Sequence, residues 1–317
     1  MINHLLVSHR VCVVSIFFFI MSISCGGRNQ SKQEQAGCEG FTLPTIPFVI
    51  TNPVERADYL GMHYWDNVDF TCTSLIQKPE ILEQAFVNYL EILPHLSEAS
   101  LFSSIGNTLA KAMVVEEMLT YITDLFEKYL YDPNAPWLNE EVYSIVLEYL
   151  IASPQVDDLN KIRPLFQMEQ INKNRQGTIA SDFVYTLSNG KQESMHKIKA
   201  DFLVLFFNNP GCSACSEYQQ GLDYSPVVTQ LINEGRLKIL AMYVDEDITA
   251  WRAYAPSIPQ MWINGYDAST AIRNEKKYDL RAIPSLYLLD KEKRVILKDV
   301  YTNQIEEWLV YTIQNAQ

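Results

Sequence analysis

Apolar residues recur three or four positions apart through residues 79–170. This period places them on one face of an α-helix, which can then pack into a core. Asn139 suits the N-cap of one such helix, and Pro164 should bend another because proline lacks the amide hydrogen. A turn at residues 131–136, which contains two prolines, separates the second helical stretch, which ends at residue 130, from the third, which begins at residue 142. The pattern predicts four helices, at residues 81–93, 113–130, 142–150 and 159–166.

After Gly177 the pattern changes to short apolar runs divided by turn residues. Phe202–Phe207 is entirely apolar, as expected of a central strand that is buried on both faces. Asn189–Gly190 predicts a tight hairpin turn, and Pro226 interrupts the helical stretch 213–234. Alternating strands and helices predict an α/β domain. The expected strands are 182–187, 202–207, 237–244, 285–289 and 295–300, before a closing helix through Ile305, Leu309 and Ile313.

The first residues have the features of an export signal. Arg10 precedes the apolar run Val11–Ile23, which is about half the length needed to span a bilayer. A basic start, a short apolar core and small residues at its end are typical of a secretory signal. The end, Ser22–Gly26, resembles a bacterial lipoprotein signal, in which cleavage precedes a cysteine, here Cys25, and a lipid is joined to its sulfur. Ser22 departs from the usual Leu, and the alternative is an ordinary signal peptide with an incidental cysteine.

The chain therefore divides into four segments. Residues 1–24 are the expected signal peptide, and the polar residues 25–43 suit a flexible tether. Residues 44–174 are the expected helical domain, and residues 175–317 are the α/β domain. Export would place the mature chain in an oxidising compartment, where disulfides persist. We therefore expect it in the cell envelope, facing the periplasm and anchored to the membrane by its lipid.

Composition and charge exclude several classes of protein. The 317 residues exceed one small domain, and an apolar content of 48% excludes disorder throughout. There are 25 basic and 38 acidic residues, and the net charge of −13 argues against a nucleic-acid binder. Residues 80–158 hold 14 acids and two lysines, so the acidity belongs to the helical domain, where we interpret it as a solvated face. Six cysteines are too few for a disulfide scaffold.

One motif carries chemistry: Cys212 and Cys215, separated by two residues, at the start of the helix that follows the buried strand. The helix dipole and the free amides there stabilise the thiolate form of Cys212. Cys215, one turn deeper, can attack a mixed disulfide and release the product. We therefore predict Cys212 as the nucleophile and Cys215 as the resolving thiol, with their redox-active disulfide in place of a cofactor. Half of a zinc site is the alternative, but a second CxxC and ligand-spaced histidines are missing, so we expect no metal.

The second feature is Ile283–Pro284, directly before the strand at 285–289. A proline at the start of a strand cannot donate to the sheet ladder. A cis peptide bond there would place the backbone of Ile283 opposite the CxxC, free to pair with an extended substrate segment. An isolated X-Pro bond is usually trans, and only the CxxC on the preceding βα unit makes cis the better prediction.

Together these residues resemble the thioredoxin fold, and specifically the TlpA/ResA-like thiol-disulfide oxidoreductases. The resemblance covers residues 175–317 and implies that Cys212, Cys215 and Pro284 are the nucleophile, the resolving cysteine and the cis-proline. It also implies that residues 250–277 form a helix-and-strand insert. Besides the motifs above, the matching segments are Ala180–Phe183 and the hairpin from Leu288 to Val295.

The whole chain is also similar to bacterial lipoproteins that join a helical domain of unknown function to such a thioredoxin domain. The segments that carry this similarity are residues 64–67, 128–133 and 208–212.

Three positions depart from the family pattern. Gly211 replaces the usual Trp before the CxxC, and Ala214 replaces the usual Pro within it. Phe206 stands six residues before Cys212, where thioredoxin has a buried acid that accepts a proton. Glu217 is close in sequence, but nothing in the sequence turns it inward. These changes are compatible with thiol exchange and leave its redox potential and proton acceptor open.

Other residues support weaker interpretations. Cys38 and Cys72 could pair and tie the tether to the helical domain, or remain two unrelated thiols. Two groups of aromatic residues could line ligand sites, although packing in the core is the more frequent role. His196 has no motif around it and is expected at the surface. The aromatic groups are Trp251, Trp262 and Tyr266 in the insert, and His63–Tyr64–Trp65.

The leading functional hypothesis is a membrane-tethered, extracytoplasmic thiol-disulfide oxidoreductase. Its expected partners are a disulfide-bearing client protein and an electron-donor thiol protein. Reduction is favoured over oxidation only because TlpA-like proteins are commonly reductants. The alternative is a non-catalytic binding lipoprotein whose helical domain recognises a partner and whose thioredoxin fold is a scaffold, since a fold alone does not establish activity. A peroxidase or glutathione-dependent activity is a third, weaker option.

Overall fold

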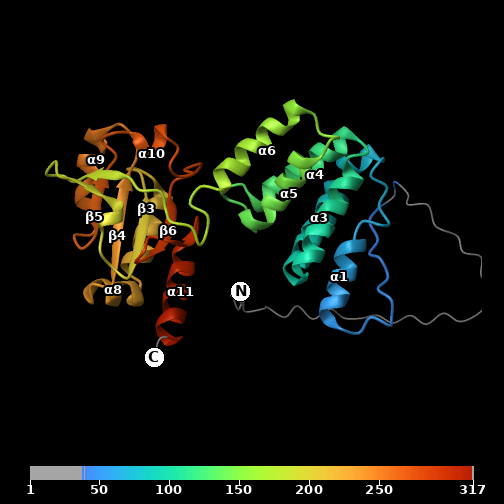
Figure 1. Ribbon diagram of the computed structural model, residues 1–317, viewed down its shortest axis with the longest axis horizontal. Helices are drawn as coiled ribbons and strands as arrows, with labels where there is room; N and C mark the ends of the chain where they lie inside the picture. Colours follow the sequence, from blue (N-terminus) through green and yellow to red (C-terminus); the bar gives the residue numbers. More distant parts are fainter. Residues whose placement is uncertain (1–37, 39, 316–317) are drawn as a thin grey trace, which may run out of the picture. The chain divides into compact units, whose positions relative to one another are not determined.

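The computed structural model describes residue 38 and residues 40–315. The expected signal peptide, Cys25 and most of the tether lie outside the described residues. Within residues 40–315, no helix is both long and apolar enough to cross a membrane. Helices come first along the described chain and a sheet follows (Figure 1), so the predicted order of an all-α region and an α/β domain is confirmed.

The helical region packs around α3, which contacts α1, α4 and α5, while α6 packs on α5 (Figure 1). The four predicted helices are present as α2, α4, α5 and α6. Asn139 caps α5, because its side chain accepts a hydrogen bond from the Val142 amide at 3.1 Å. Pro164 lies inside α6. The helices are α1 (Pro53–His63), α2 (Pro79–Ile92), α3 (Glu98–Ala112), α4 (Glu116–Leu130), α5 (Glu140–Ala152) and α6 (Asp158–Ile171), with 3-10 turns at Thr73–Gln77 and Leu93–His95.

Hydrophobic periodicity missed α1 and α3. The buried face of α3 includes Ser104, Gly106 and Thr108 instead of a continuous row of large apolar residues. Gly106 lies so close to α5 that an added Cβ would come within 2.9 Å of the Tyr149 ring. Ser104 and Thr108 hydrogen-bond the Tyr89 hydroxyl at 2.8 and 3.2 Å. Buried hydroxyls need such partners, and these come from a different helix, which no local pattern reveals.

An aromatic cluster fills the core of the helical region. Tyr64 and Trp65 are 1% and 2% exposed, and their rings lie 5.2 and 5.6 Å from that of Tyr89. The Tyr64 hydroxyl donates a hydrogen bond to the Ala85 carbonyl oxygen at 2.8 Å. Tyr64 and Trp65 are therefore core residues, and of the three-residue cluster only the His63 side chain remains accessible.

The α/β domain is built on a seven-stranded sheet with the order β2-β1-β5-β4-β3-β6-β7. Strands β3, β4 and β5 run parallel to one another, and the remaining neighbours pair antiparallel. The β1–β2 hairpin turns at Asn189–Gly190 as predicted, with a Gly190 φ of +82°. The strands are β1 (Val184–Thr186), β2 (Gln192–Ser194), β3 (Phe202–Phe207), β4 (Leu237–Tyr243), β5 (Ile263–Tyr266), β6 (Ser285–Asp290) and β7 (Val295–Lys298).

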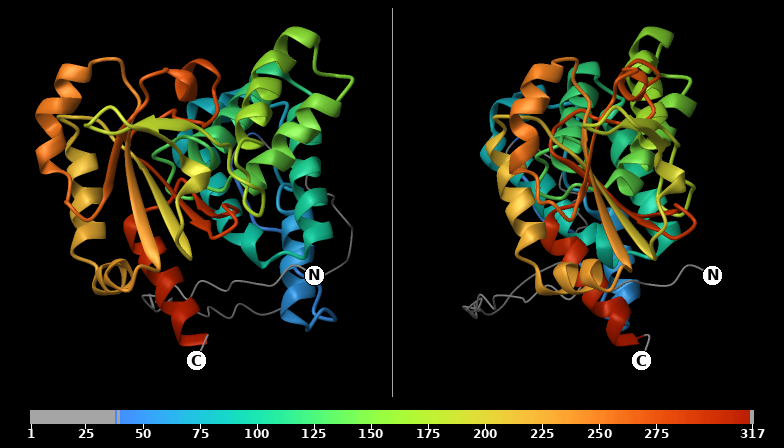
Figure 2. Two further views of the ribbon diagram at one scale, coloured as in Figure 1. Left: turned by 60° about the vertical axis from the view of Figure 1, so that its left-hand side comes forward. Right: turned by 90° about the vertical axis from the view of Figure 1, so that its left-hand side faces the viewer.

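Strand β3 is buried on both faces, as its apolar sequence predicts. Leu203 and Leu205 pack into the core on one face, whereas Val204 and Phe206 pack into the core on the other. Three helices cover this second face, and α11 lies beside the sheet in both views of Figure 2. Pro226 begins α8 and so divides the stretch predicted at 213–234. These helices are α7 (Ser213–Asp223), α8 (Pro226–Asn233) and α11 (Thr302–Asn315).

The insert between β4 and β6 contains helix and strand, as the family resemblance implies. It consists of α9 (Ile248–Tyr254), strand β5 and α10 (Ala271–Asn274). Trp251 and Trp262 are 2% and 7% exposed, and the partly buried Tyr266 ring lies 4.6 Å from that of Trp251. The aromatic residues of the insert therefore pack as core.

Candidate active site

The loop between β3 and α7 carries the CxxC pair, and two hydrogen bonds attach its start to the end of β4. The Asn208 amide donates to the Met242 carbonyl oxygen on β4 at 3.0 Å. The Asn209 side chain donates to Asp245 at 2.7 Å. Gly211 has a φ of +73°, a conformation that glycine adopts freely and a bulky side chain only with strain. The departure from Trp at this position therefore has a backbone reason.

Cys212 is the N-cap residue of α7. Its sulfur accepts a hydrogen bond from the Cys215 amide at 3.0 Å. The first turn of a helix has unpaired amides and a partial positive charge, both of which stabilise an anion. The backbone thus supplies the environment that favours a thiolate at this position.

Cys212 and Cys215 form a disulfide, with their Cα atoms 5.2 Å apart. The Cys215 side chain is 0% exposed and packs against Phe206 in the core, whereas Cys212 is partly exposed. A disulfide or thiol from outside can therefore reach Cys212 and not Cys215. This asymmetry supports the assignment of Cys212 as nucleophile and Cys215 as resolving thiol, which stays a prediction.

The Ile283–Pro284 segment lies directly beside the cysteine pair. The peptide bond between the two residues is cis. The Ile283 carbonyl oxygen is 3.8 Å from the Cys212 sulfur, although the residues are 71 positions apart in sequence. The fold therefore brings three of the predicted site residues, Cys212, Ile283 and Pro284, to one place, with Cys215 beneath them.

A small cavity of about 50 Å³ adjoins Pro284. The rings of Tyr218 and Tyr301 in its wall lie 5.9 Å apart. Pro133 and Leu138 of the helical region also line it. Residues of both regions therefore meet next to the Ile283–Pro284 segment.

The acid that thioredoxin buries beneath its cysteines has no counterpart at Phe206, which is 0% exposed among apolar neighbours. Glu217 is exposed to solvent and does not replace it. The cavity instead contains Asp299, directly after β7, which accepts a hydrogen bond from Ser285 at 2.5 Å. Desolvation, and then the charge of Glu140, raise the pKa of Asp299 to about 6. Asp299 was not predicted as a site residue; the available signal was an acid inside the strand expected at 295–300, which the structure ends at Lys298.

The remaining predicted residues lie elsewhere. Cys38 and Cys72 form a disulfide, which ties residue 38 to the start of the first 3-10 turn. Cys25 lies outside the described residues. His196 is exposed, and its Nε2 lies 2.7 Å from the Ala180 carbonyl oxygen. In the described part of the chain, no three His, Cys, Asp or Glu residues converge as metal ligands.

Comparisons with known proteins match the helical region to one domain family and most of the chain to a solved structure. Residues 24–174 match a domain of unknown function, DUF5106. A thioredoxin-like protein of known crystal structure from Bacteroides caccae is 48% identical with a TM-score of 0.81, and the match covers 86% of this chain and 98% of that one. No curated protein matches the chain.

Two further solved structures each match less than half of this chain. The C-terminal domain of an uncharacterized protein from Bacteroides fragilis is 44% identical, with a TM-score of 0.43, over 44% of this chain and 99% of its own. The thioredoxin domain of a thiol-disulfide oxidoreductase from Bacteroides vulgatus is 17% identical, with a TM-score of 0.38, over 42% of this chain and 97% of its own.

The B. caccae match extends over nearly all of that protein's chain, so this chain belongs to the thioredoxin-like proteins. The predicted fold class, a thioredoxin-like α/β domain preceded by an all-α domain, is confirmed.

Proposed function

We propose that this protein is an exported thiol-disulfide oxidoreductase of the TlpA/ResA-like type that reduces disulfides in client proteins. A lipid on Cys25 would hold it to the membrane on the periplasmic side of the cell envelope. The observation that supports the activity is the position of Cys212. Its sulfur lies at a helix N-terminus, is partly exposed, and is 3.8 Å from the Ile283 carbonyl oxygen, with Cys215 buried behind it.

The reaction begins from the reduced pair. The Cys212 thiolate attacks one sulfur of the client disulfide, which forms a Cys212–client disulfide and releases the other client sulfur as a thiolate. Cys215 then gives its proton, directly or through water, to the client thiolate that was released, and the Cys215 thiolate attacks the Cys212 sulfur. The Cys212–Cys215 disulfide forms, and the second client sulfur leaves. The client gains two electrons, and a dithiol protein returns two electrons to Cys212 and Cys215 by the same chemistry in reverse.

The Ile283–Pro284 segment would bind the client. A carbonyl oxygen this close to the reacting sulfur can accept a hydrogen bond from an extended polypeptide laid across it. Pairing of this kind recognises backbone rather than sequence, so it suits a range of clients.

The test of the proposed activity is reduction of insulin by the mature chain with dithiothreitol as the electron donor. Wild type should turn insulin over, and Cys212→Ser should fall to the background rate of dithiothreitol alone, because no nucleophile remains. With insulin as the trap, Cys215→Ser should accumulate a mixed disulfide and Cys212→Ser should not. Equal turnover by wild type and Cys212→Ser would refute the proposal.

One observation favours the alternative function, a binding lipoprotein whose helical domain recognises a partner. A groove of about 380 Å³ opens between α4 and α6, with the acids Glu116, Asp124 and Glu127 in its lining. A hollow of this size is in the range of ligand sites. If the protein is such a binding lipoprotein, wild type and Cys212→Ser should both reduce insulin only at the background rate of dithiothreitol. The same experiment therefore separates the two functions.

A further inference from the structure

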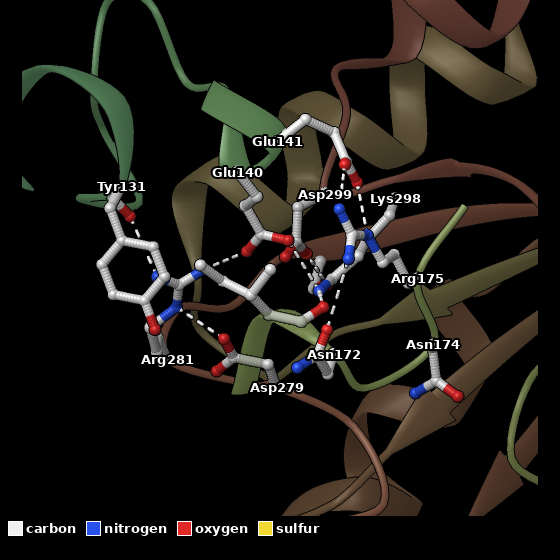
Figure 3. Close-up of polar contacts among 12 residues, drawn as sticks. Tyr131, Glu140, Glu141, Asn172, Asn174, Arg175, Asp279, Arg281, Lys298 and Asp299 are labelled. Atoms are coloured by element: carbon white, nitrogen blue, oxygen red, sulfur yellow. Dashed lines mark hydrogen bonds and ion pairs between the residues drawn. The ribbon is translucent and has the colours of Figure 1, made fainter. Parts of the chain in front are cut away.

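The segment that carries Ile283 and Pro284 is attached to the helical region through Arg281. The Arg281 side chain is 22% exposed, and its guanidinium carbon lies 3.6 Å from the centre of the Tyr131 ring. Nη1 donates to the Tyr131 carbonyl oxygen at 2.9 Å, and Nη2 donates to Glu140 at 2.8 Å. Tyr131 and Glu140 stand at the two ends of the turn between α4 and α5 (Figure 3). A single side chain of the α/β domain thus binds both ends of that turn.

Glu140 also binds a second cation of the α/β domain. Its other carboxylate oxygen lies 2.7 Å from Lys298 Nζ, and these side chains are 14% and 8% exposed. The same Nζ donates to the carbonyl oxygen of Ile171, the last residue of α6, at 3.2 Å. Figure 3 shows Glu140 between Arg281 and Lys298. At such low exposure salt screens an ion pair little, and removal of one partner leaves a buried charge unpaired.

The linker between the two regions is fixed as well. Asn174 is 5% exposed and has a φ of +51°. Its side-chain amide donates to the Lys277 carbonyl oxygen at 2.8 Å, and its side-chain oxygen accepts from the Ser181 amide at 2.7 Å. The segment from Lys277 to Pro284 is therefore held at its start by the linker and at Arg281 by the α4–α5 turn.

The segment held by Arg281 and the linker lies directly beside the Cys212 sulfur. Arg281 lies two residues before Ile283, whose carbonyl oxygen is 3.8 Å from the Cys212 sulfur. Pro133 and Leu138 of the same α4–α5 turn line the cavity beside Pro284. A displacement of the turn would therefore move the backbone that faces Cys212.

We propose that the helical region is a positioning element of the reaction site, in which Glu140 and Tyr131 hold Arg281 and thereby hold the Ile283–Pro284 segment where a client polypeptide pairs with it. The inference rests on the proposed function, because it assigns the helical region a part in binding the client of that reaction. The ligand class is an extended polypeptide next to a disulfide. A small disulfide reaches Cys212 without pairing to the Ile283 backbone, so it does not need this positioning.

The test compares two variants of the full mature chain with a matched control. Glu140→Gln removes the carboxylate that Arg281 and Lys298 share. Arg281→Lys keeps the positive charge but loses the planar fork and its stacking on Tyr131. Glu148→Gln, the control, makes the same change at an exposed position of the same helix, α5.

We expect Glu140→Gln and Arg281→Lys to raise KM for insulin by about tenfold while kcat stays within about twofold, because client binding and not chemistry is weakened. The rate at which each reduced variant attacks the small disulfide 5,5′-dithiobis(2-nitrobenzoate) should match wild type. The Glu148→Gln control should match wild type in both assays. An unchanged KM for insulin, or an equal loss with insulin and with the small disulfide, would overturn the inference.

Amide hydrogen exchange over residues 279–284 supplies a readout that needs no activity. Exchange there should be faster in Glu140→Gln than in Glu148→Gln, with α3 unchanged, because an attachment of this segment is lost. If wild type does not reduce insulin, the proposed function fails, and faster exchange still supports the attachment. If exchange in Glu140→Gln equals that of the control, the attachment is refuted even where insulin is reduced.

Discussion

Asp299 is half-buried in the lining of the cavity next to Pro284, and its surroundings disfavour its ionised form. Desolvation is the largest cause, and the carboxylate of Glu140 adds to it, so the pKa of Asp299 rises to about 6. The hydrogen bond from Ser285 and the charges of Lys298 and Arg281 oppose this rise without cancelling it. The folded protein therefore keeps this proton to a higher pH than the unfolded chain does.

The pH dependence of stability should reveal this proton. Between pH 4 and 6 the folded state binds the Asp299 proton and the unfolded state does not, so stability falls as pH rises through this window. Asp299→Asn removes the effect and keeps an oxygen for the Ser285 hydrogen bond. The stability of this variant relative to wild type should therefore increase from pH 4 to pH 6, by roughly 2 to 3 kcal/mol.

Urea denaturation at each pH measures this difference. Asp201→Asn, the same substitution at a 54% exposed side chain, is the control for the loss of one charge. A constant difference between Asp299→Asn and wild type across the window would contradict the assignment.

Some residues of the site can be predicted from their neighbours in the sequence, and others cannot. Cys212, Cys215 and Pro284 could be predicted as site residues because a CxxC after a buried strand and a proline before another strand are local patterns. Arg281 has no such pattern, because the residue that gives it a role, Glu140, is 141 positions away. Long-range ion pairs leave no local trace, and this is why the residues behind the site were missed.

At the scale of elements, apolar content decided which ones could be predicted. Strand β3 was predicted because every residue from Phe202 to Phe207 is apolar, and such a run fits a strand covered on both faces. Helix α3 was missed because Ser104, Gly106 and Thr108 lie on its buried face. Small residues there allow close packing against neighbouring helices, which depends on those neighbours and not on the helix itself.

Close packing also explains Gly265 in strand β5. A Cβ at this position would lie 2.9 Å from Tyr185 Cδ2 and 3.2 Å from Tyr185 Cβ. Tyr185 is 0% exposed and has no room to move away. Gly265→Ala should therefore destabilise the protein by about 1 to 3 kcal/mol, the usual cost of overpacking.

Chemical denaturation measures the effect of Gly265→Ala. Gly40→Ala is the control, because no atom lies within 4 Å of a Cβ built there, and it should stay within about 0.5 kcal/mol of wild type. Equal stability of Gly265→Ala and Gly40→Ala would contradict this prediction, because it would mean that β5 moves away from Tyr185 on β1 without a loss of stability.

At the scale of the whole molecule, the acidity of the helical region has two parts. From the sequence, these acids were all interpreted as a solvated face. Glu140 differs, because it binds Arg281 and Lys298 of the α/β domain at low exposure. Glu141, next to it, binds Arg175 of the linker. Part of the negative charge therefore joins the two regions, which the count of acids alone could not show.

Membrane attachment is the prediction that concerns the whole chain. Expressed with its own signal in a bacterium, the protein should incorporate labelled palmitate and sediment with membranes. Cys25→Ser should lose the label, because the proposed lipid would be joined to that sulfur. Cys12→Ser, within the signal itself, should keep it. A labelled Cys25→Ser variant would contradict the lipoprotein assignment.

The sequence by itself determined the order of the regions, the buried strand, and the pair of cysteines with its proline. Each of these is written in neighbouring residues, because hydrophobic period, turn residues and the position of a thiol at a helix start act over a few positions. Only the tertiary structure decided that Asp299 lines the cavity beside Pro284 and that Arg281 joins the site to the helical region. These contacts link residues far apart in the chain, and they exist because packing of the two cores brings their elements together.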